Sequence, residues 1–139
     1  MKTTLTIEES QRLIDLGVDP KMASMKEFVP IHPEVLKGNA EYAKPWGWFP
    51  KFRLEDILSI LPKEIDGYML NMSACANEWH AYYEKIEILG RRIILRTNSA
   101  PELIDALYQL LIWVLENNYL NQRNQTSSRK EVDNDQPIR

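Results

Sequence analysis

The chain has 139 residues, the size of one ordinary domain, and a domain of that size buries roughly two thirds of the surface that its unfolded chain exposes. It therefore needs no metal or disulfide to fold, and its single cysteine excludes an internal disulfide. Residues 1–120 carry a net charge of −4, from 13 Lys and Arg against 17 Asp and Glu, which argues against a nucleic-acid partner because phosphate-binding surfaces display a basic excess.

The first elements expected along the chain are two short helices. Thr6 and Glu9 have the spacing of a capping box, and the apolar residues that follow predict a helix over residues 7–16. Asp19 then caps a short second helix or turn, with Pro20 at the first position, where its missing N–H has no cost. No apolar core of a signal peptide precedes these elements, so we expect a cytoplasmic protein.

Residues 29–53 are expected to be mostly irregular loop, because the segment holds four prolines and two glycines. A solvated linker would not carry as much apolar area as this loop does. Its aromatic residues are Tyr42, Trp46, Trp48, Phe49 and Phe52. Two interpretations stay open: a lid packed on the domain's own core, or a surface that binds a partner or a ligand.

A helix and a strand are expected next. Leucine and isoleucine at helical spacing predict a helix over residues 54–61, which Pro62 ends. From Tyr68 to Ser73 the side chains alternate in character with the period of two that is typical of a strand.

The strand is expected to continue into an antiparallel hairpin. A two-residue turn at residues 89–90 would put Ile86 opposite Ile93 and Glu87 opposite Arg92, which would form a cross-strand ion pair. Arg92 and Arg96, which flank Ile94 and would share one face of a strand, indicate the solvated side of a sheet more than a phosphate clamp. The face that we expect to be the core side carries His80, Tyr82, Ile86, Ile88, Ile93 and Leu95.

The last expected element is a long helix. Ser99 and Glu102 have the spacing of a second capping box, and the helix is predicted to run to about Asn118. Its polar stripe is narrow, with Ile112 inside the stripe and Trp113 at its edge. Such a helix must be covered on most sides, by its own sheet and helices or by a second copy, so a homodimer stays open. The apolar stretch is shorter than the roughly 20 residues of a membrane span, so no membrane partner is expected.

The composition changes after residue 120. Residues 121–139 hold no aromatic residue and many Asn, Gln and Ser, which predicts a disordered polar tail. We therefore expect one domain, residues 1–120, followed by this tail.

The stretch "NMSACANEWHAYYEK" places Cys75, Glu78 and His80 close together in the sequence and raises the question of a reactive site. A cysteine nucleophile needs a base within hydrogen-bond reach, and a metal site would also need His32 to converge on the sheet. Lone cysteines are more often small packing residues. We therefore expect no catalytic, cofactor-binding or metal-binding residues, and no enzyme activity.

The order of these signals resembles a family of small uncharacterised proteins encoded in prophages and other mobile elements of gut bacteria. The segments that carry the resemblance are "LTIEESQRLIDLGVDPKMA", "LEDILSILPKEI", "EWHAYY" and "ELIDALYQLLIWVLENNYL". The resemblance covers nearly all of the chain except the polar tail. What it implies is context, an intracellular accessory protein of a phage or mobile element, and it transfers no functional residue to this chain.

The sequence predicts an α+β domain: a three- or four-stranded antiparallel sheet packed by the long C-terminal helix and by the shorter N-terminal helices. The first functional hypothesis is a non-catalytic module that binds a protein partner or a second copy of itself. The alternative is a protein that binds a small molecule or peptide in an aromatic-lined pocket. The candidate interaction residues are Tyr42, Trp46, Trp48, Phe49, Ile112 and Trp113.

Overall fold

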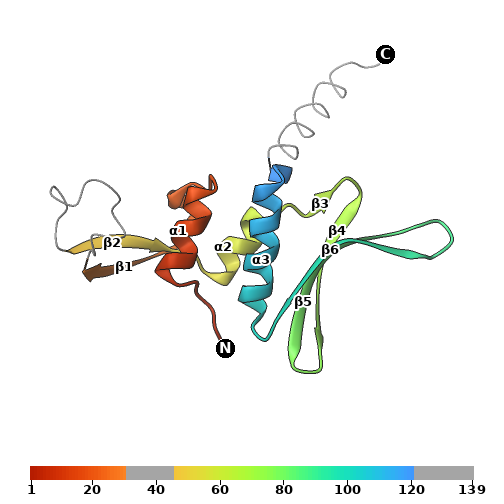
Figure 1. Ribbon diagram of the computed structural model, residues 1–139, viewed down its shortest axis with the longest axis horizontal. Helices are drawn as coiled ribbons and strands as arrows, with labels where there is room; N and C mark the ends of the chain where they lie inside the picture. Colours follow the sequence, from red (N-terminus) through yellow and green to blue (C-terminus); the bar gives the residue numbers. More distant parts are fainter. Residues whose placement is uncertain (31–45, 121–139) are drawn as a thin grey trace, which may run out of the picture.

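A computed structural model of the chain describes residues 1–30 and 46–120 and has the expected α+β fold (Figure 1). The helices are α1 (Ile7–Asp15), α2 (Leu54–Ile60) and α3 (Leu103–Glu116), with one turn of 3-10 helix, η1 (Pro20–Met22). The strands are β1 (Met25–Pro30), β2 (Trp46–Lys51), β3 (Glu64–Ile65), β4 (Tyr68–Cys75), β5 (Glu78–Ile86) and β6 (Arg92–Ala100). Tyr42, the side chain of Trp46 and the expected polar tail lie outside the described residues.

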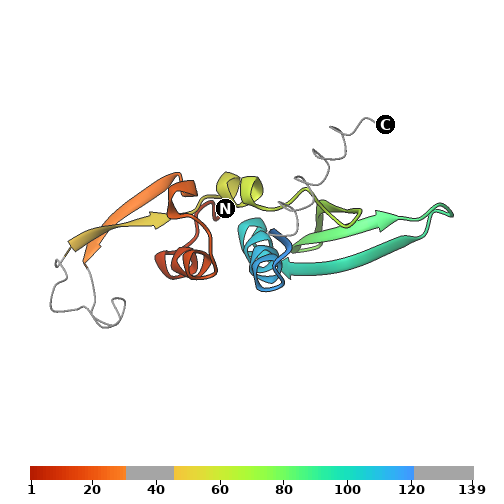
Figure 2. The same ribbon diagram turned by 90° about the horizontal axis from the view of Figure 1, so that it is seen from above.

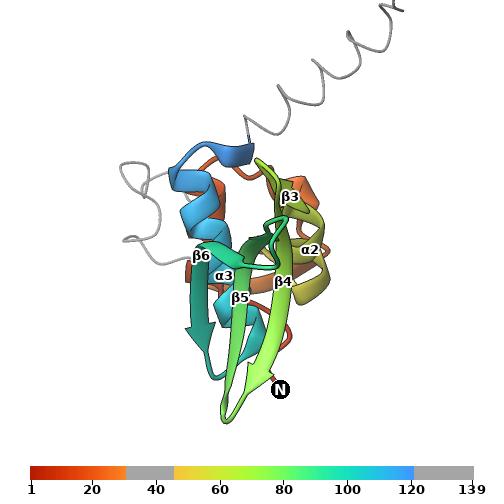
Figure 3. The same ribbon diagram turned by 90° about the vertical axis from the view of Figure 1, so that its right-hand side faces the viewer.

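The larger sheet is an antiparallel meander in the order β3-β4-β5-β6, in which each strand pairs with its neighbour in the chain. The expected three- or four-stranded antiparallel sheet is therefore confirmed. Figure 3 shows one face of this sheet turned to the viewer, with α3 behind it. α1 and α2 lie on the other side of α3, so the long helix is enclosed between the sheet and the two shorter helices (Figures 1 and 2).

The two helix caps predicted in the N-terminal half are both present. The hydroxyl oxygen of Thr6 accepts a hydrogen bond from the Glu9 backbone N–H at 3.1 Å, and the Glu9 carboxylate accepts one from the Thr6 N–H at 2.9 Å. Asp19 caps η1 by accepting a hydrogen bond from the Lys21 N–H at 2.9 Å. The expected second helix or turn is this single turn.

The second predicted capping box is wrong. α3 begins at Leu103 with Glu102 at the cap position, and Glu102 makes no capping hydrogen bond with its side chain. Ser99 belongs instead to β6, where its hydroxyl lies 2.7 Å from the ring nitrogen Nδ1 of His80. The carboxylate of Glu102 accepts a hydrogen bond from the backbone N–H of Lys2, so it holds the N-terminus against the helix.

The core face of β5 is the reverse of the expected one. Ala81 and Tyr83 are fully buried in the core, and the alternation of the strand puts His80 and Tyr82 on the open face. Ala81 leaves room for α3 to approach the sheet. The hydroxyl of Tyr83 donates to the carbonyl oxygen of Pro62 at 2.7 Å, which supplies the partner that a buried hydroxyl requires.

Of the four aliphatic residues expected on the core side, two are exposed and Ile93 is half-buried. Ile86 is 66% exposed and Ile88 fully exposed, whereas Leu95 does pack against the core. A β-bulge between Tyr83 and Glu84 shifts the pairing with β6 at this level, so the alternation in β6 does not continue unbroken along the strand.

The expected register of the β5–β6 hairpin is also wrong, by one residue. Ile86 pairs with Arg92, not with the residue after it. The Glu87 N–H donates to the Arg91 carbonyl oxygen and the Gly90 N–H donates to that of Glu87, which closes a three-residue loop. Gly90 has a φ of +84°, the left-handed conformation that this loop type needs at its last position.

The shift in register changes the ion pairs. The expected pair between Glu87 and Arg92 is replaced by two pairs on neighbouring levels of the hairpin. Glu87 pairs with Arg91 at 2.7 Å, and the Arg92 Nε donates to the Glu84 carboxylate at 2.6 Å.

The segment expected to be irregular contains a strand. β2 pairs antiparallel with β1, and Phe28 lies opposite Trp48. Each strand of a two-stranded sheet has one free side, so Pro30 and Pro50 are tolerated within it. The hairpin stands out from the body at the left end of the molecule in Figure 1.

One buried carboxylate joins this hairpin to the body. Asp56, in the first turn of α2, accepts three hydrogen bonds on one oxygen. The donors are the backbone N–H of Arg53 at 2.8 Å and the backbone N–H and hydroxyl of Ser24 at 2.9 and 2.8 Å. Ser24 immediately precedes β1, so the carboxylate fixes the start of the hairpin against the start of α2.

Replacing Asp56 with Ala should lower the free energy of unfolding by about 2–3 kcal/mol, because three donors lose a charged acceptor in a nearly buried position. Urea denaturation measures this change. Glu55→Ala is the matched control, since Glu55 is exposed and lies in the same turn; it should cost less than about 1 kcal/mol. Equal effects of the two changes would contradict the anchoring role.

Replacing Tyr83 with Phe should lower the free energy of unfolding by about 1–2 kcal/mol, because the buried Pro62 carbonyl loses its donor. Tyr82→Phe on the open face should change it by less than about 0.5 kcal/mol. The two variants compared in urea denaturation test the assignment of the core face. A larger loss for Tyr82→Phe would reverse that assignment.

Candidate functional site

The four predicted interaction residues whose side chains the structure describes fall on two separate surfaces. Trp48 and Phe49 lie in β2, on opposite faces of the hairpin, and Trp48 is 65% exposed while Phe49 is half-buried. Ile112 and Trp113 lie in α3 and line a groove in the middle of the molecule. These four described residues therefore do not lie together in one site.

The first surface is an exposed aromatic pair formed by Phe28 and Trp48. Their ring centroids lie 4.9 Å apart with the planes tilted by 55°. Phe28 is 48% exposed, so both rings present a large part of their area to solvent. Phe28 is not among the predicted interaction residues, because residues 25–30 lack the alternation that would indicate a strand. Phe52, another ring of the predicted loop, is buried in the core, so the described part of the segment is in part core and in part surface.

A second exposed apolar surface lies at the opposite end of the molecule. The β5–β6 hairpin extends beyond the body at the right of Figure 1 and ends in three exposed aliphatic residues, Ile86, Ile88 and Leu89. We call these three residues the hairpin tip. The sequence pattern groups Ile86 and Ile88 with His80 and Tyr82, on the face that it predicts to be the core side and that is open in the structure.

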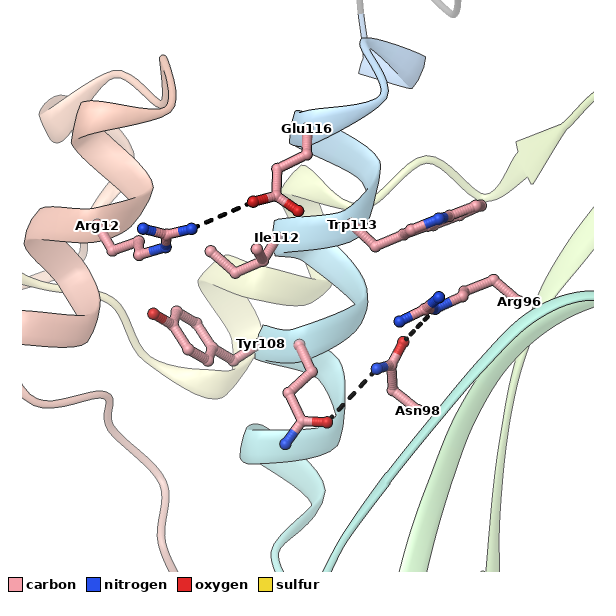
Figure 4. Close-up of a pocket in the computed structure, with 8 residues that line it drawn as sticks. Arg12, Arg96, Asn98, Tyr108, Ile112, Trp113 and Glu116 are labelled. Atoms are coloured by element: carbon pink, nitrogen blue, oxygen red, sulfur yellow. Dashed lines mark hydrogen bonds and ion pairs between the residues drawn. The ribbon is translucent and has the colours of Figure 1, made fainter.

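The groove is bounded by three elements (Figure 4). α1 contributes Arg12 on one side and β6 contributes Arg96 on the other, while α3 forms the floor between them. The groove has a volume of about 440 Å³. Its lining residues are Arg12, Arg96, Asn98, Tyr108, Gln109, Ile112, Trp113 and Glu116.

The two arginines of the groove differ in their partners. Arg12 pairs with Glu116 at 3.1 Å across the gap between α1 and α3. Arg96 stacks over the ring of Trp113, with its guanidinium carbon 5.8 Å from the ring centroid, and its Nε donates to the Asn98 side chain at 3.3 Å. Among the described residues no carboxylate pairs with Arg96.

Trp113 is held in place by its other neighbours. Its ring centroid lies 6.4 Å from that of the buried Tyr83 and 5.0 Å from that of Tyr119.

Burial raises the pKa of Tyr108, which also lines the groove, and the charge of Glu9 raises it further. The hydroxyl of Tyr108 therefore stays protonated and available as a donor throughout the neutral range.

The open face of the sheet carries the residues considered for chemistry. Cys75 is exposed and pairs with Glu78 at the β4–β5 turn, whereas His80 pairs with Ser73 and meets the Ser99 hydroxyl on its other side. A hollow of about 290 Å³ lies beside His80. In the described part of the chain, no carboxylate hydrogen bonds to His80 and no three metal-ligating side chains gather. His32 lies outside the described residues.

Comparison of the chain with protein-family models, with curated proteins and with solved structures found no match. None of the helices in residues 1–30 and 46–120 has the length and apolarity that a membrane crossing requires.

The two tryptophans should respond differently to truncation. Trp113→Ala should lower the free energy of unfolding by about 2–4 kcal/mol, because its ring packs against the core. Trp48→Ala should cost less than about 1 kcal/mol, because most of its surface is already in water. Urea denaturation of both variants distinguishes a packing ring from a surface ring, and general unfolding of Trp48→Ala would show that this ring is core.

Proposed function

We propose that the protein is a non-catalytic interaction module that binds a protein partner through the aromatic pair of the β1–β2 hairpin. The observation that carries the proposal is the exposure of Trp48, 65% of whose surface is in water while its ring already packs on Phe28. Tryptophan is among the residues that most often dominate the energy of a protein interface. Two strands fix the position of the pair before a partner arrives, which reduces the entropy lost on binding.

The charges near the pair indicate the kind of surface that it fits. Lys26 lies two residues before Phe28 in β1, on the same face of the hairpin and exposed. Lys51 pairs with Glu27 at 2.8 Å on the opposite face, so its charge is already compensated. A partner that complements this face has an apolar recess for the two rings and a carboxylate at the rim for Lys26.

The cellular context is a further part of the proposal. The resemblance of the sequence signals supports a cytoplasmic accessory protein of a phage or mobile element. The free and exposed thiol of Cys75 fits a reducing compartment. A second copy of the chain is one partner that the experiment below would identify, because the cross-linked product would then have twice the mass of the chain.

The alternative is a protein that binds a small molecule or peptide with the aromatic residues of the loop, and this site has less support. Neither Trp48 nor Phe49 lines either of the two hollows described above. The hollow that does contain a tryptophan is the groove beside Trp113.

Photo-cross-linking in the native host tests the proposal. A benzophenone amino acid placed at Lys26 should capture one defined protein, and adding Trp48→Ala should abolish that product while the fold remains intact. Loss of an anchor tryptophan should weaken the interaction by about 30-fold or more. The matched control places the same amino acid at Met69, which is comparably exposed but lies on the larger sheet. The same products from both positions, or a product indifferent to Trp48→Ala, would refute the proposed surface.

A further inference from the structure

We infer that the groove between α1, α3 and β6 is a binding site for a small organic acid with a single carboxylate and an apolar or aromatic body. This site is separate from the aromatic pair and goes beyond the proposed function. Figure 4 shows its construction, with α3 between the two rims that carry the arginines.

The charge of the lining selects a monoanion. The groove residues carry two guanidinium groups and one carboxylate, a local net charge of +1 on a chain whose net charge is −3. The Glu116 carboxylate compensates Arg12, so the uncompensated positive charge is that of Arg96. A ligand with one carboxylate would complete the pairing.

The guanidinium of Arg96 is oriented before any ligand arrives. Its contact with the Trp113 ring and its hydrogen bond to Asn98 restrict the side chain. Because Nε is used by Asn98, the terminal nitrogens remain available for the two oxygens of a carboxylate, which the planar guanidinium matches well. Lysine at this position would keep the charge but lose this geometry.

The rest of the groove suits an apolar body with a polar edge. Ile112 and the rings of Tyr108 and Trp113 provide apolar contact area. The amide of Gln109 already accepts from Asn98 at 3.4 Å, which leaves its own N–H groups for a second ligand oxygen. The volume of about 440 Å³ lies within the range of small-molecule sites.

Other ligand classes fit the lining less well. A phosphate dianion would need more than one uncompensated cation, and the groove offers one among the described residues. A peptide could present the same chemistry through its C-terminal carboxylate, but the volume of about 440 Å³ is that of a small-molecule site. We therefore commit to the free acid and make the peptide an outcome of the test.

Nuclear magnetic resonance titration of the full chain tests the inference. The probes are benzoate, phenylacetate, 3-phenylpropionate and indole-3-acetate, each compared with its uncharged amide. At least one acid should shift the Trp113 indole N–H signal and the Asn98 and Gln109 side-chain amides saturably below about 10 mM, the affinity expected for a ligand of about ten heavy atoms. The matching amide should bind at least about tenfold more weakly.

Two charge variants that should change the affinity for the acid in opposite directions provide a further test. Arg96→Gln should weaken binding of that acid about tenfold or more, while Glu116→Gln should strengthen it about two- to fivefold, because Arg12 is then freed for the ligand. Arg91→Gln at the far end of the β5–β6 hairpin is the matched control and should leave binding unchanged.

Four results would overturn the inference. They are the absence of saturation by all four acids, equal affinity for acid and amide, indifference to Arg96→Gln, and binding of a capped peptide that ends in Phe where none of the free acids binds. The exposed position of Arg96 keeps the variant folded, and its thermal unfolding verifies this.

Discussion

The structure depends on one constraint, the enclosure of α3 between two layers that the same chain provides. The residues of α3 that are fully or nearly fully buried are Ile104, Ala106, Leu107, Leu110, Leu111 and Val114. The sheet covers one side of the helix, and α2 with α1 covers the other (Figure 2). The strip that neither layer reaches, around Ile112, is the floor of the groove. The groove is therefore a consequence of the way in which a nearly all-apolar helix is covered.

The second layer is held by polar contacts at a few points. The Lys2 ammonium donates to Glu9 of α1 at 3.1 Å and to Asp105 of α3 at 2.7 Å, so the N-terminus bridges the two helices. Burial lowers the pKa of Lys2, but these two carboxylates outweigh that effect and raise it above its ordinary value. Asp56 plays the corresponding role for the hairpin. Short polar links of this kind fix the order of the elements, while the apolar core supplies most of the stability.

Local signals predicted the elements better than they predicted the pairing. The capping box at Thr6 and the proline at the end of α2 act within a few residues, and both predictions are confirmed. The register at residues 87–91 depends on Gly90 in a left-handed conformation, which sequence spacing alone does not reveal. On the buried face of β5, the Tyr83 hydroxyl finds its acceptor in the Pro62 carbonyl, which lies 21 residues away in the chain. Because tyrosines occur on both faces of β5, composition could not decide between them.

The same distinction applies to the candidate sites. Trp48 and Trp113 were identified from their residue type, but their roles come from long-range neighbours, Phe28 across the hairpin and Arg96 from β6. The sequence indicates Arg96 only as one of two arginines on the solvated face of a strand. Its place beside α3 follows from the pairing of Arg96 with Tyr83, a residue of the core face.

The projecting β5–β6 hairpin has an evolutionary consequence. Its tip contributes nothing to the core, and the ion pairs of Glu84 with Arg92 and of Glu87 with Arg91 stabilise the strands beneath it. Substitutions at Ile88 or Leu89 therefore carry almost no penalty in folding. Selection can therefore change the hairpin tip without compensating substitutions elsewhere. The tip can diversify faster than the rest of the domain.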